Sequence, residues 1–243
     1  MIRYDSAKET AFGPFDLNLE EHPTKCLMVF DDEIWEELIL QNETETFQVR
    51  NAQGRVFDSY RYVENNGEKI LVMSPTTGAA GSVCDMEILI GSGIDKIVAF
   101  GTCGWMDESL ARNMIIVPAA AYREEGTSCH YLPDSDAIDM DARAVDLMKE
   151  KISAAGLQYR EGKIWTTDAV YRETFGKIQY MKERGCLGVE MELSALLAVA
   201  EYRNIKFAEF LICEDAVGVR NPGSIERDNN AIFCAAIDIL SEL

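Results

Sequence analysis

Short apolar runs with the composition of buried strands alternate along this chain with segments that have helical periodicity. The strand-like runs cover residues 25–30, 69–73, 96–100, 114–118 and 206–213. The helical segments cover residues 31–41, 139–155, 191–203 and 224–243. Because such alternation is typical of one sheet between layers of helices, the sequence predicts an α/β fold with a mixed sheet and helices on both of its faces.

Residues 53–69 differ from the rest of the chain because apolar and polar residues alternate there. Tyr60 and Tyr62 are separated by a polar residue, and the sequence Asn-Asn-Gly at 65–67 suits a tight turn. We therefore expect a β-hairpin beside the main sheet.

Length, composition and charge limit the class of protein. With 243 residues, 47% of them apolar, and no internal repeat, the chain is expected to form a single domain over residues 1–243. The formal net charge of -19 repels nucleic-acid phosphates and anionic membranes, which favours a small-molecule partner. Neither a signal peptide nor an apolar run of about 20 residues is evident, which favours a cytoplasmic location.

The cysteines and histidines argue against a metal centre. Seven cysteines are spread over the chain without a Cys-x-x-Cys pair, and His22 and His130 are the two histidines. A zinc site needs about four such ligands held close together, whereas scattered cysteines with apolar neighbours are typical of buried, reduced thiols. We therefore expect no bound metal.

A glycine-containing turn directly follows the apolar run at 96–100. In α/β sheets, ligands bind beyond the carboxyl ends of the strands, and glycine lets backbone N–H groups come close to an anion. Gly101 and Thr102 are therefore candidates for anion binding, with the Thr102 hydroxyl as a further donor. A turn with a purely structural role is the commoner case for such a sequence.

Two glutamates interrupt the segment at residues 185–202, which is apolar on both sides of them. Burying a carboxylate without partners costs several kcal/mol, so Glu190 and Glu192 must meet polar groups. The adjacent 2′- and 3′-hydroxyls of a ribose suit this requirement, because both can donate hydrogen bonds to one carboxylate. A structural ion pair with a buried arginine explains these two residues equally well.

A third segment ends a strand with two threonines and an aspartate. Asp168 follows the strand-like residues 163–167 and precedes a helix that is expected to begin near Tyr171. Its carboxylate is therefore placed to accept hydrogen bonds from the first turn of that helix. Val170 and Tyr171 would then stand at the wall of a pocket.

A fourth segment places acids at the end of the apolar run at 206–213. Glu214 and Asp215 come directly after this run, and Arg227 follows near the start of the last helical segment. An acid at a strand end with an arginine within reach is a candidate proton donor, although a surface salt bridge is the commoner case.

Taken in this order, the four segments resemble the nucleoside phosphorylase family, which includes bacterial purine and uridine phosphorylases and the related nucleosidases. The resemblance runs from about Lys25 to the C-terminus, and the sequence Val-Glu-Met-Glu at 189–192 is its most specific part. It implies a three-layer αβα sandwich with a distorted mixed sheet. It also implies a homo-oligomer, such as a dimer or a hexamer.

The resemblance implies roles at the sugar and phosphate end of a site. Glu192 would bind the 2′- and 3′-hydroxyls of a ribose, Met191 would pack against the sugar, and Glu190 would support them. Gly101 and Thr102 would bind phosphate.

The resemblance also implies a contribution from a second subunit and a pocket for the base. Arg55, in the stretch Arg-x-Phe-x-x-Tyr-Arg, looks like the arginine that a neighbouring subunit donates to the phosphate, so the homo-oligomer interface would be part of the site. Val170, Tyr171 and Asp168 would line the pocket for the base.

At the base, Asp215 would protonate N7 of a departing purine and Arg227 would assist it. The uridine enzymes usually lack this acid, so the resemblance favours purine nucleosides over uridine. It implies a nucleoside phosphorylase, a pentosyltransferase that uses phosphate to cleave the N-glycosidic bond of a purine nucleoside or uridine, giving free base and ribose or deoxyribose 1-phosphate. Phosphate is then the co-substrate, and no other cofactor is expected.

Two positions differ from the family's usual phosphate site. Ile34 and Ala99 stand where the family usually has arginines, and the acids Asp31, Asp32 and Glu33 precede Ile34. A nucleosidase reaction with water is therefore an alternative, in which Glu33 would activate the water, although these acids also suit a helix N-terminus. A nucleoside-binding protein without catalytic activity is a third alternative.

Overall fold

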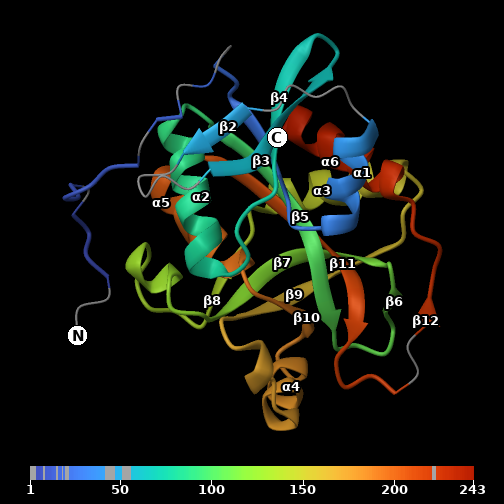
Figure 1. The fold of residues 1–243 in the computed structure, drawn as a ribbon. Coiled ribbons are helices and arrows are strands. Elements are labelled where there is room, and N and C mark those ends of the chain that lie inside the picture. The colour runs from blue at the N-terminus through green and yellow to red at the C-terminus, as the bar shows by residue number, and fades with distance from the viewer. Residues whose placement is uncertain are drawn as a thin grey trace.

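The computed structural model describes residues 4–41, 47–50, 56–220 and 223–243, except residues 8, 15, 18, 20 and 21. One twisted sheet runs through the centre of the molecule, and helices cover both of its faces (Figure 1). Helices α2 and α5 pack against each other on one face, and α3 and α6 pack against each other on the opposite face. This arrangement confirms the expected three-layer α/β sandwich with a mixed sheet.

Strands and helices are numbered separately, each in the order in which they occur along the chain. The strands are β1 (Lys25–Val29), β2 (Phe47–Arg50), β3 (Val56–Asn65), β4 (Glu68–Met73), β5 (Lys96–Trp105), β6 (Ala111–Arg112), β7 (Ile115–Glu124), β8 (Ala137–Asp139), β9 (Tyr159–Thr167), β10 (Cys186–Glu190), β11 (Lys206–Ala216) and β12 (Gly223–Ser224). The α-helices are α1 (Asp32–Gln41), α2 (Ala79–Gly91), α3 (Ala142–Ala154), α4 (Phe175–Lys182), α5 (Leu193–Arg203) and α6 (Asn229–Glu242). Two short 3-10 helices are η1 (Ser128–His130) and η2 (Val170–Arg172).

The large sheet has the strand order β10-β9-β7-β11-β5-β1-β4-β3-β2, and β8 pairs with β7. Strand β5 pairs in parallel with β1 and β11, whereas β11 pairs with β7 in the antiparallel sense. Because β1, β5 and β11 are parallel neighbours, their carboxyl ends meet at one edge of the sheet.

The sheet is distorted where β10 meets two other strands. Strand β10 pairs in parallel with β9 and in the antiparallel sense with β5, where Gly188 faces Trp105 and Val189 faces Gly104. A Cβ atom on Gly188 would lie 3.0 Å from the carbonyl oxygen of Gly104, so a larger residue would push these strands apart. This close approach brings the end of β10 beside the end of β5.

The strand-like runs of the sequence are found as β1, β4, β5, β7 and β11. The expected hairpin is also present, with Asn66 and Gly67 at positive φ in its turn. However, β4 pairs with β1, so the hairpin continues the main sheet rather than standing beside it.

Three helix boundaries differ from the expectation. Helix α3 begins at Ala142, after Asp141 accepts hydrogen bonds from the first turn, and β8 precedes it. Helix α6 begins at Asn229 because Asp228 caps it. Near Tyr171 the chain forms only the 3-10 helix η2, and α4 begins at Phe175.

The core lies where helix α5 and strands β5 and β11 pack. The first eight residues of α5, Leu193 to Ala200, are all buried, as the nearly uniform apolar composition of this segment predicts. Phe100 of β5 stacks on Phe210 of β11 with ring centroids 5.3 Å apart. Since burying one such side chain contributes about 1.5–3 kcal/mol, this packing fixes the strands whose ends carry the site.

Within the described residues, no helix has both the length and the apolar composition that a membrane crossing requires.

Candidate active site

A cavity of about 270 Å³ lies at the carboxyl ends of β5, β10 and β11. It brings together seven residues that the sequence singled out: Thr102, Val170, Glu190, Met191, Glu192, Glu214 and Asp215. They come from the end of β5, from η2, from the junction of β10 and α5, and from the end of β11. This convergence makes the cavity the candidate active site.

Glu190 is a buried carboxyl group at the end of β10. Its Oε2 accepts hydrogen bonds from the backbone N–H groups of Glu192 (2.6 Å) and Leu193 (2.7 Å), and its Oε1 accepts one from the hydroxyl of Thr166. Burial, followed by the nearby charge of Glu192, raises the pKa of Glu190 to about 8. Glu190 therefore holds a proton at neutral pH and supports the turn that presents its neighbours.

Glu192 is 8% exposed and borders the same cavity. Its Oε1 accepts a hydrogen bond from the N–H of Gly78 (2.5 Å), and its Oε2 accepts one from the N–H of Met191 (3.2 Å). No described cation forms an ion pair with it, and burial raises the pKa of its carboxyl group. Since a carboxylate oxygen has two lone pairs, each oxygen keeps one acceptor site for a ligand in the cavity.

The candidate phosphate residues occupy different places. Thr102 lines the cavity, whereas Gly101 is explained by packing, because a Cβ atom there would lie 2.5 Å from Cβ of Phe30. Ile34 and Ala99, which stand in place of the usual arginines, are both buried. Arg55 lies outside the described residues.

Two acids from the end of β11 also border the cavity. Glu214 and Asp215 both line it, and Arg112 lies 3.7 Å from Glu214. The register of β11 against β5 shifts between Cys213 and Asp215, which carries Asp215 out of the apolar part of the strand. As a result Asp215 is exposed.

The candidate base-pocket residues are divided between the cavity and the surface. Val170 lines the cavity and is 47% exposed, while Tyr171 is 96% exposed and is not among the lining residues. Asp168 does not cap a helix, contrary to the expectation, because its Oδ2 accepts a hydrogen bond from the N–H of Gly126 (2.8 Å). Thr174 instead caps α4.

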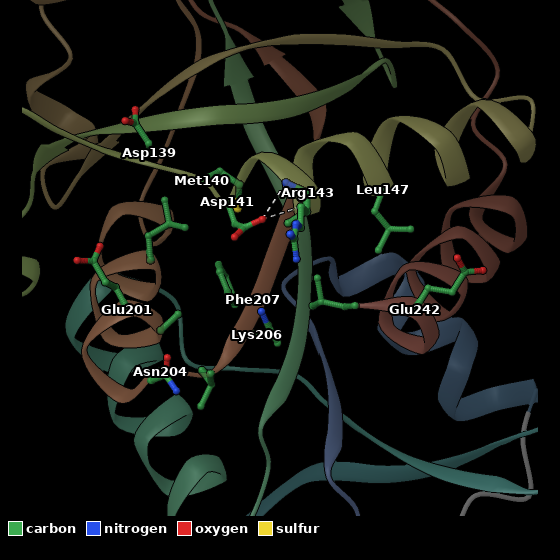
Figure 2. Close-up of a pocket in the computed structure, with 15 residues that line it drawn as sticks. Asp139, Met140, Asp141, Arg143, Leu147, Glu201, Asn204, Lys206, Phe207 and Glu242 are labelled. Carbon is green, nitrogen blue, oxygen red and sulfur yellow. Dashed lines mark hydrogen bonds between the residues drawn. The ribbon is translucent and has the colours of Figure 1, made fainter.

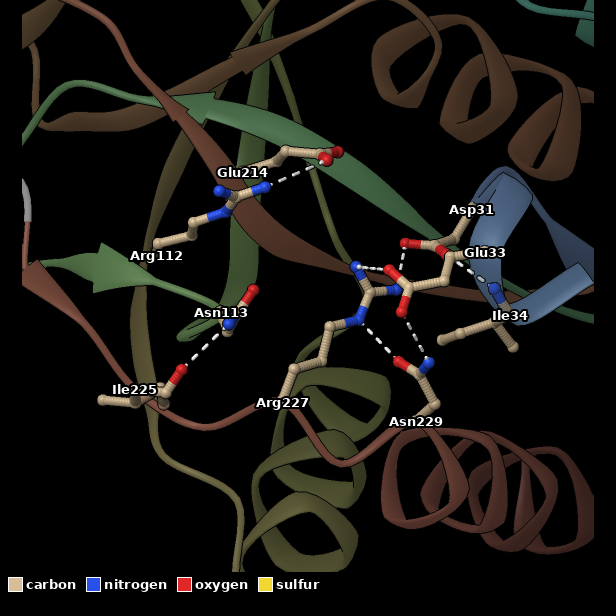
Figure 3. Close-up of polar contacts among 9 residues, drawn as sticks. All are labelled: Asp31, Glu33, Ile34, Arg112, Asn113, Glu214, Ile225, Arg227 and Asn229. Carbon is tan, nitrogen blue, oxygen red and sulfur yellow. Dashed lines mark hydrogen bonds and ion pairs between the residues drawn. The ribbon is translucent and has the colours of Figure 1, made fainter. Parts of the chain in front are cut away.

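Arg227 and Glu33 lie away from this cavity, in a cluster that Figure 3 shows. The guanidinium of Arg227 forms an ion pair with Asp31 and hydrogen-bonds to Asn229, and it lies 3.5 Å from Glu33. Asp31 is 2% exposed and also accepts a hydrogen bond from the N–H of Ile34. Arg227 is therefore the cation that compensates the buried carboxylate of Asp31, and it does not pair with Asp215.

Several lining residues were not singled out by the sequence. Thr77, Cys103, Gly104, Glu173, Val189 and Val217 also line the cavity, together with Phe30. Thr77 lies just before α2, and Glu173 follows η2. A position next to the end of an element was the one feature of the sequence that could have marked these two residues as lining a site. They line the cavity because the fold brings together segments that are distant in the sequence.

The side chains that line the cavity are strongly acidic. Five of its lining residues are acids, namely Glu173, Glu190, Glu192, Glu214 and Asp215, and none of its described lining residues is Lys or Arg. The described residues also contain no group of three or more His, Cys, Asp or Glu side chains arranged to hold a metal ion. The site is therefore rich in hydrogen-bond acceptors.

A separate groove of about 630 Å³ lies by the start of β11, whereas the candidate site lies at the end of that strand. Figure 2 shows Arg143 and Lys206 near its centre and Glu201 and Glu242 on opposite sides. Glu242 is already paired with Lys151 at 2.6 Å. None of the candidate site residues lies in this groove.

Comparison with known proteins relates this chain to enzymes that act on nucleosides. The model of the phosphorylase superfamily matches residues 26–236. The purine nucleoside phosphorylase DeoD-type of Yersinia enterocolitica is 29% identical over 159 residues, which are 63% of each chain. The uncharacterised protein R802 of Acanthamoeba polyphaga mimivirus is 29% identical over 147 residues, 60% of this chain and 57% of that protein. The matches therefore span less than two thirds of the length of these relatives.

A solved structure extends the similarity over most of the fold. The AMP nucleosidase of Bacteroides thetaiotaomicron superposes with a TM-score of 0.71 and covers 90% of this chain and 88% of its own, at 20% sequence identity. At this identity the similarity is one of fold.

Proposed function

Because this chain belongs to the phosphorylase superfamily, we propose that it cleaves the N-glycosidic bond of a purine nucleoside. The observation that supports this most strongly is Glu192, a buried carboxyl group beside an open cavity that, among the described residues, has no cation partner and keeps one acceptor site on each oxygen. The two adjacent hydroxyls of a ribose can both donate hydrogen bonds to this carboxyl group. Met191 then packs against the sugar.

The chemistry requires an acid at the opposite end of the cavity. As the bond between C1′ and N9 breaks, positive charge develops on the sugar and negative charge on the base. Asp215 is the proposed acid, and it transfers its proton to N7 so that the base leaves neutral. A base in the cavity would cover the exposed side chain of Asp215. Because uridine has no N7, this role favours purines.

In the first candidate reaction, inorganic phosphate attacks C1′ and the sugar leaves as ribose 1-phosphate or deoxyribose 1-phosphate. The similarity to purine nucleoside phosphorylases supports this reaction. Thr102 and the backbone next to Gly101 would bind the phosphate. We propose that Arg55 of a second copy of the chain adds the cation, which would make the protein a homo-oligomer, a dimer or a hexamer; no metal or other cofactor is required.

In the second candidate reaction, water attacks C1′, loses a proton and leaves free ribose. The five acids that line the cavity favour this alternative. An ionised carboxylate at contact distance repels a unit negative charge by about 4 kcal/mol at an effective dielectric constant near 20. Glu33, proposed from the sequence as the base that activates water, would have to leave the cluster of Arg227 to take part.

One assay separates these reactions. The purified protein is incubated with adenosine, inosine or uridine, with and without phosphate, and the base and the sugar product are identified. Ribose 1-phosphate supports the first reaction and free ribose the second, whereas a purine nucleoside that stays intact in every mixture contradicts the proposal. Release of uracil at a similar rate would contradict the role of Asp215.

A substitution checks that the assay reports on this cavity. Glu192→Gln is expected to lower kcat/KM by at least about tenfold, because charge-assisted hydrogen bonds to the ribose diol are lost. The variant's folding is verified from its thermal unfolding. Full activity in a folded Glu192→Gln variant would move the site elsewhere.

A further inference from the structure

Glu214 and Asp215 are consecutive residues of β11, yet both line the candidate cavity. Side chains of consecutive strand residues normally point to opposite faces of a sheet. Here the pairing with β5 changes register between Cys213 and Asp215, which is the irregularity that a β-bulge produces. The distortion therefore places two adjacent acids at the base end of the site.

These two acids have different surroundings. Arg112 Nη2 lies 3.7 Å from Glu214 Oε1, and Figure 3 shows these two side chains facing each other. Asp215, in contrast, has neither a hydrogen bond nor an ion pair with another described residue. A carboxylate beside a guanidinium is an acceptor of hydrogen bonds. Glu214 is thus the acceptor of the pair, and Asp215 is the acid available to carry the proton that the proposed reaction requires.

A purine presents two neighbouring groups to such a pair. N7 is an acceptor in every purine, and the substituent on C6 beside it is an amino donor in adenine but an acceptor oxygen in the 6-oxopurines. A donor next to an acceptor in the protein therefore complements adenine. The same pair brings a carboxylate against O6 of hypoxanthine or guanine, where no hydrogen bond forms.

We propose that Glu214 selects nucleosides of 6-aminopurines over those of 6-oxopurines, an inference that rests on the proposed function of the same cavity. The exocyclic amino group donates a hydrogen bond to Glu214, while Asp215 donates its proton to N7. Arg112 holds the Glu214 side chain from outside the cavity.

The first test compares two substrates in the wild-type protein. We expect kcat/KM for adenosine to exceed that for inosine by about tenfold or more, because Glu214 accepts a hydrogen bond from the 6-amino group but faces the acceptor oxygen of a 6-oxopurine without forming one. An inosine value equal to or above the adenosine value overturns the inference and leaves the proposed function intact. Absence of cleavage of both substrates contradicts the proposed function instead.

The second test uses a variant and a matched control. Glu214→Gln is expected to lower the adenosine-to-inosine ratio by about tenfold, because the amide can donate to O6 as well as accept from an amino group. Glu173→Gln removes an acid from the same cavity and should leave this ratio unchanged. An unchanged ratio in a folded Glu214→Gln variant overturns the inference.

A binding measurement gives an answer that does not depend on turnover or on the folding of a variant. Calorimetry with the wild-type protein is expected to give a Kd for adenine that is about tenfold below the Kd for hypoxanthine. Equal affinities, or tighter binding of hypoxanthine, overturn the inference.

Discussion

Glu190 combines burial, three hydrogen-bond donors and an acidic neighbour, so its protonation couples to folding. Its pKa rises from the ordinary 4.5 to about 8 in the folded chain, which means that the folded state binds the proton more tightly than the unfolded state. The stabilisation is fully present below pH 4.5 and is lost as the pH rises to about 8. We expect the unfolding free energy to fall across this window, as measured by urea titrations between pH 5 and 8.5.

Glu190→Gln tests this assignment, because its side chain keeps the shape of the neutral acid and does not titrate. We expect the pH dependence to become flatter. The slope that remains would arise from the other acids whose pKa values burial raises, namely Glu192, Glu209, Asp85 and Glu173. Parallel curves for the wild type and the variant would show that Glu190 does not titrate in this window.

At the same scale, the sequence identified individual residues that need polar partners. An acid inside an apolar segment requires a polar partner, so Glu190 and Glu192 could be singled out before their contacts were known. The partner of Arg227 could not be predicted, because Asp31 lies 196 positions away and its burial depends on the packing of β1. Side-chain pairing between distant segments has no local signal.

At the scale of elements, the packing of β5 against the end of β1 depends on Gly101. A Cβ atom there would lie 2.5 Å from Cβ of Phe30, which cannot move without its backbone. We expect Gly101→Ala to lower the unfolding free energy by about 1–3 kcal/mol, the usual effect of overpacking. Urea unfolding at constant pH measures the change.

Gly176→Ala is the matched control, because nothing lies within 4 Å of the added Cβ and the residue is in helix α4. Alanine favours a helix over glycine by about 0.5–1 kcal/mol, so this variant should be slightly more stable than the wild type. Equal destabilisation by both substitutions would mean that contact with Phe30 is not the cause.

The elements that could be predicted share one property. β1, β4, β5, β7, β11 and α5 are buried along most of their length, so their composition alone identifies them. In contrast, α4 and η2 have exposed apolar residues such as Tyr171 and Phe175, which blur the helical pattern. The register shift in β11, which brings Glu214 into the cavity, comes from pairing with β5 and leaves no mark in the sequence of β11.

For the whole molecule, Arg227 joins segments from the two ends of the chain. It connects the buried Asp31, between β1 and α1, with Asn229 at the start of α6 (Figure 3). We expect Arg227→Met to lower the unfolding free energy by about 3 kcal/mol, because Asp31 would stay buried without a cation. Calorimetric unfolding at pH 7 measures this loss.

The double variant Asp31→Asn with Arg227→Met separates the ion pair from the rest of the packing. It should be more stable than Arg227→Met alone, because removing both charges leaves no buried carboxylate unpaired. If Arg227 assists Asp215 in catalysis, as the family resemblance implies, the single variant will instead lose kcat while keeping its stability. Unfolding and turnover measured on the same preparation therefore decide whether this arginine stabilises the fold or takes part in the reaction.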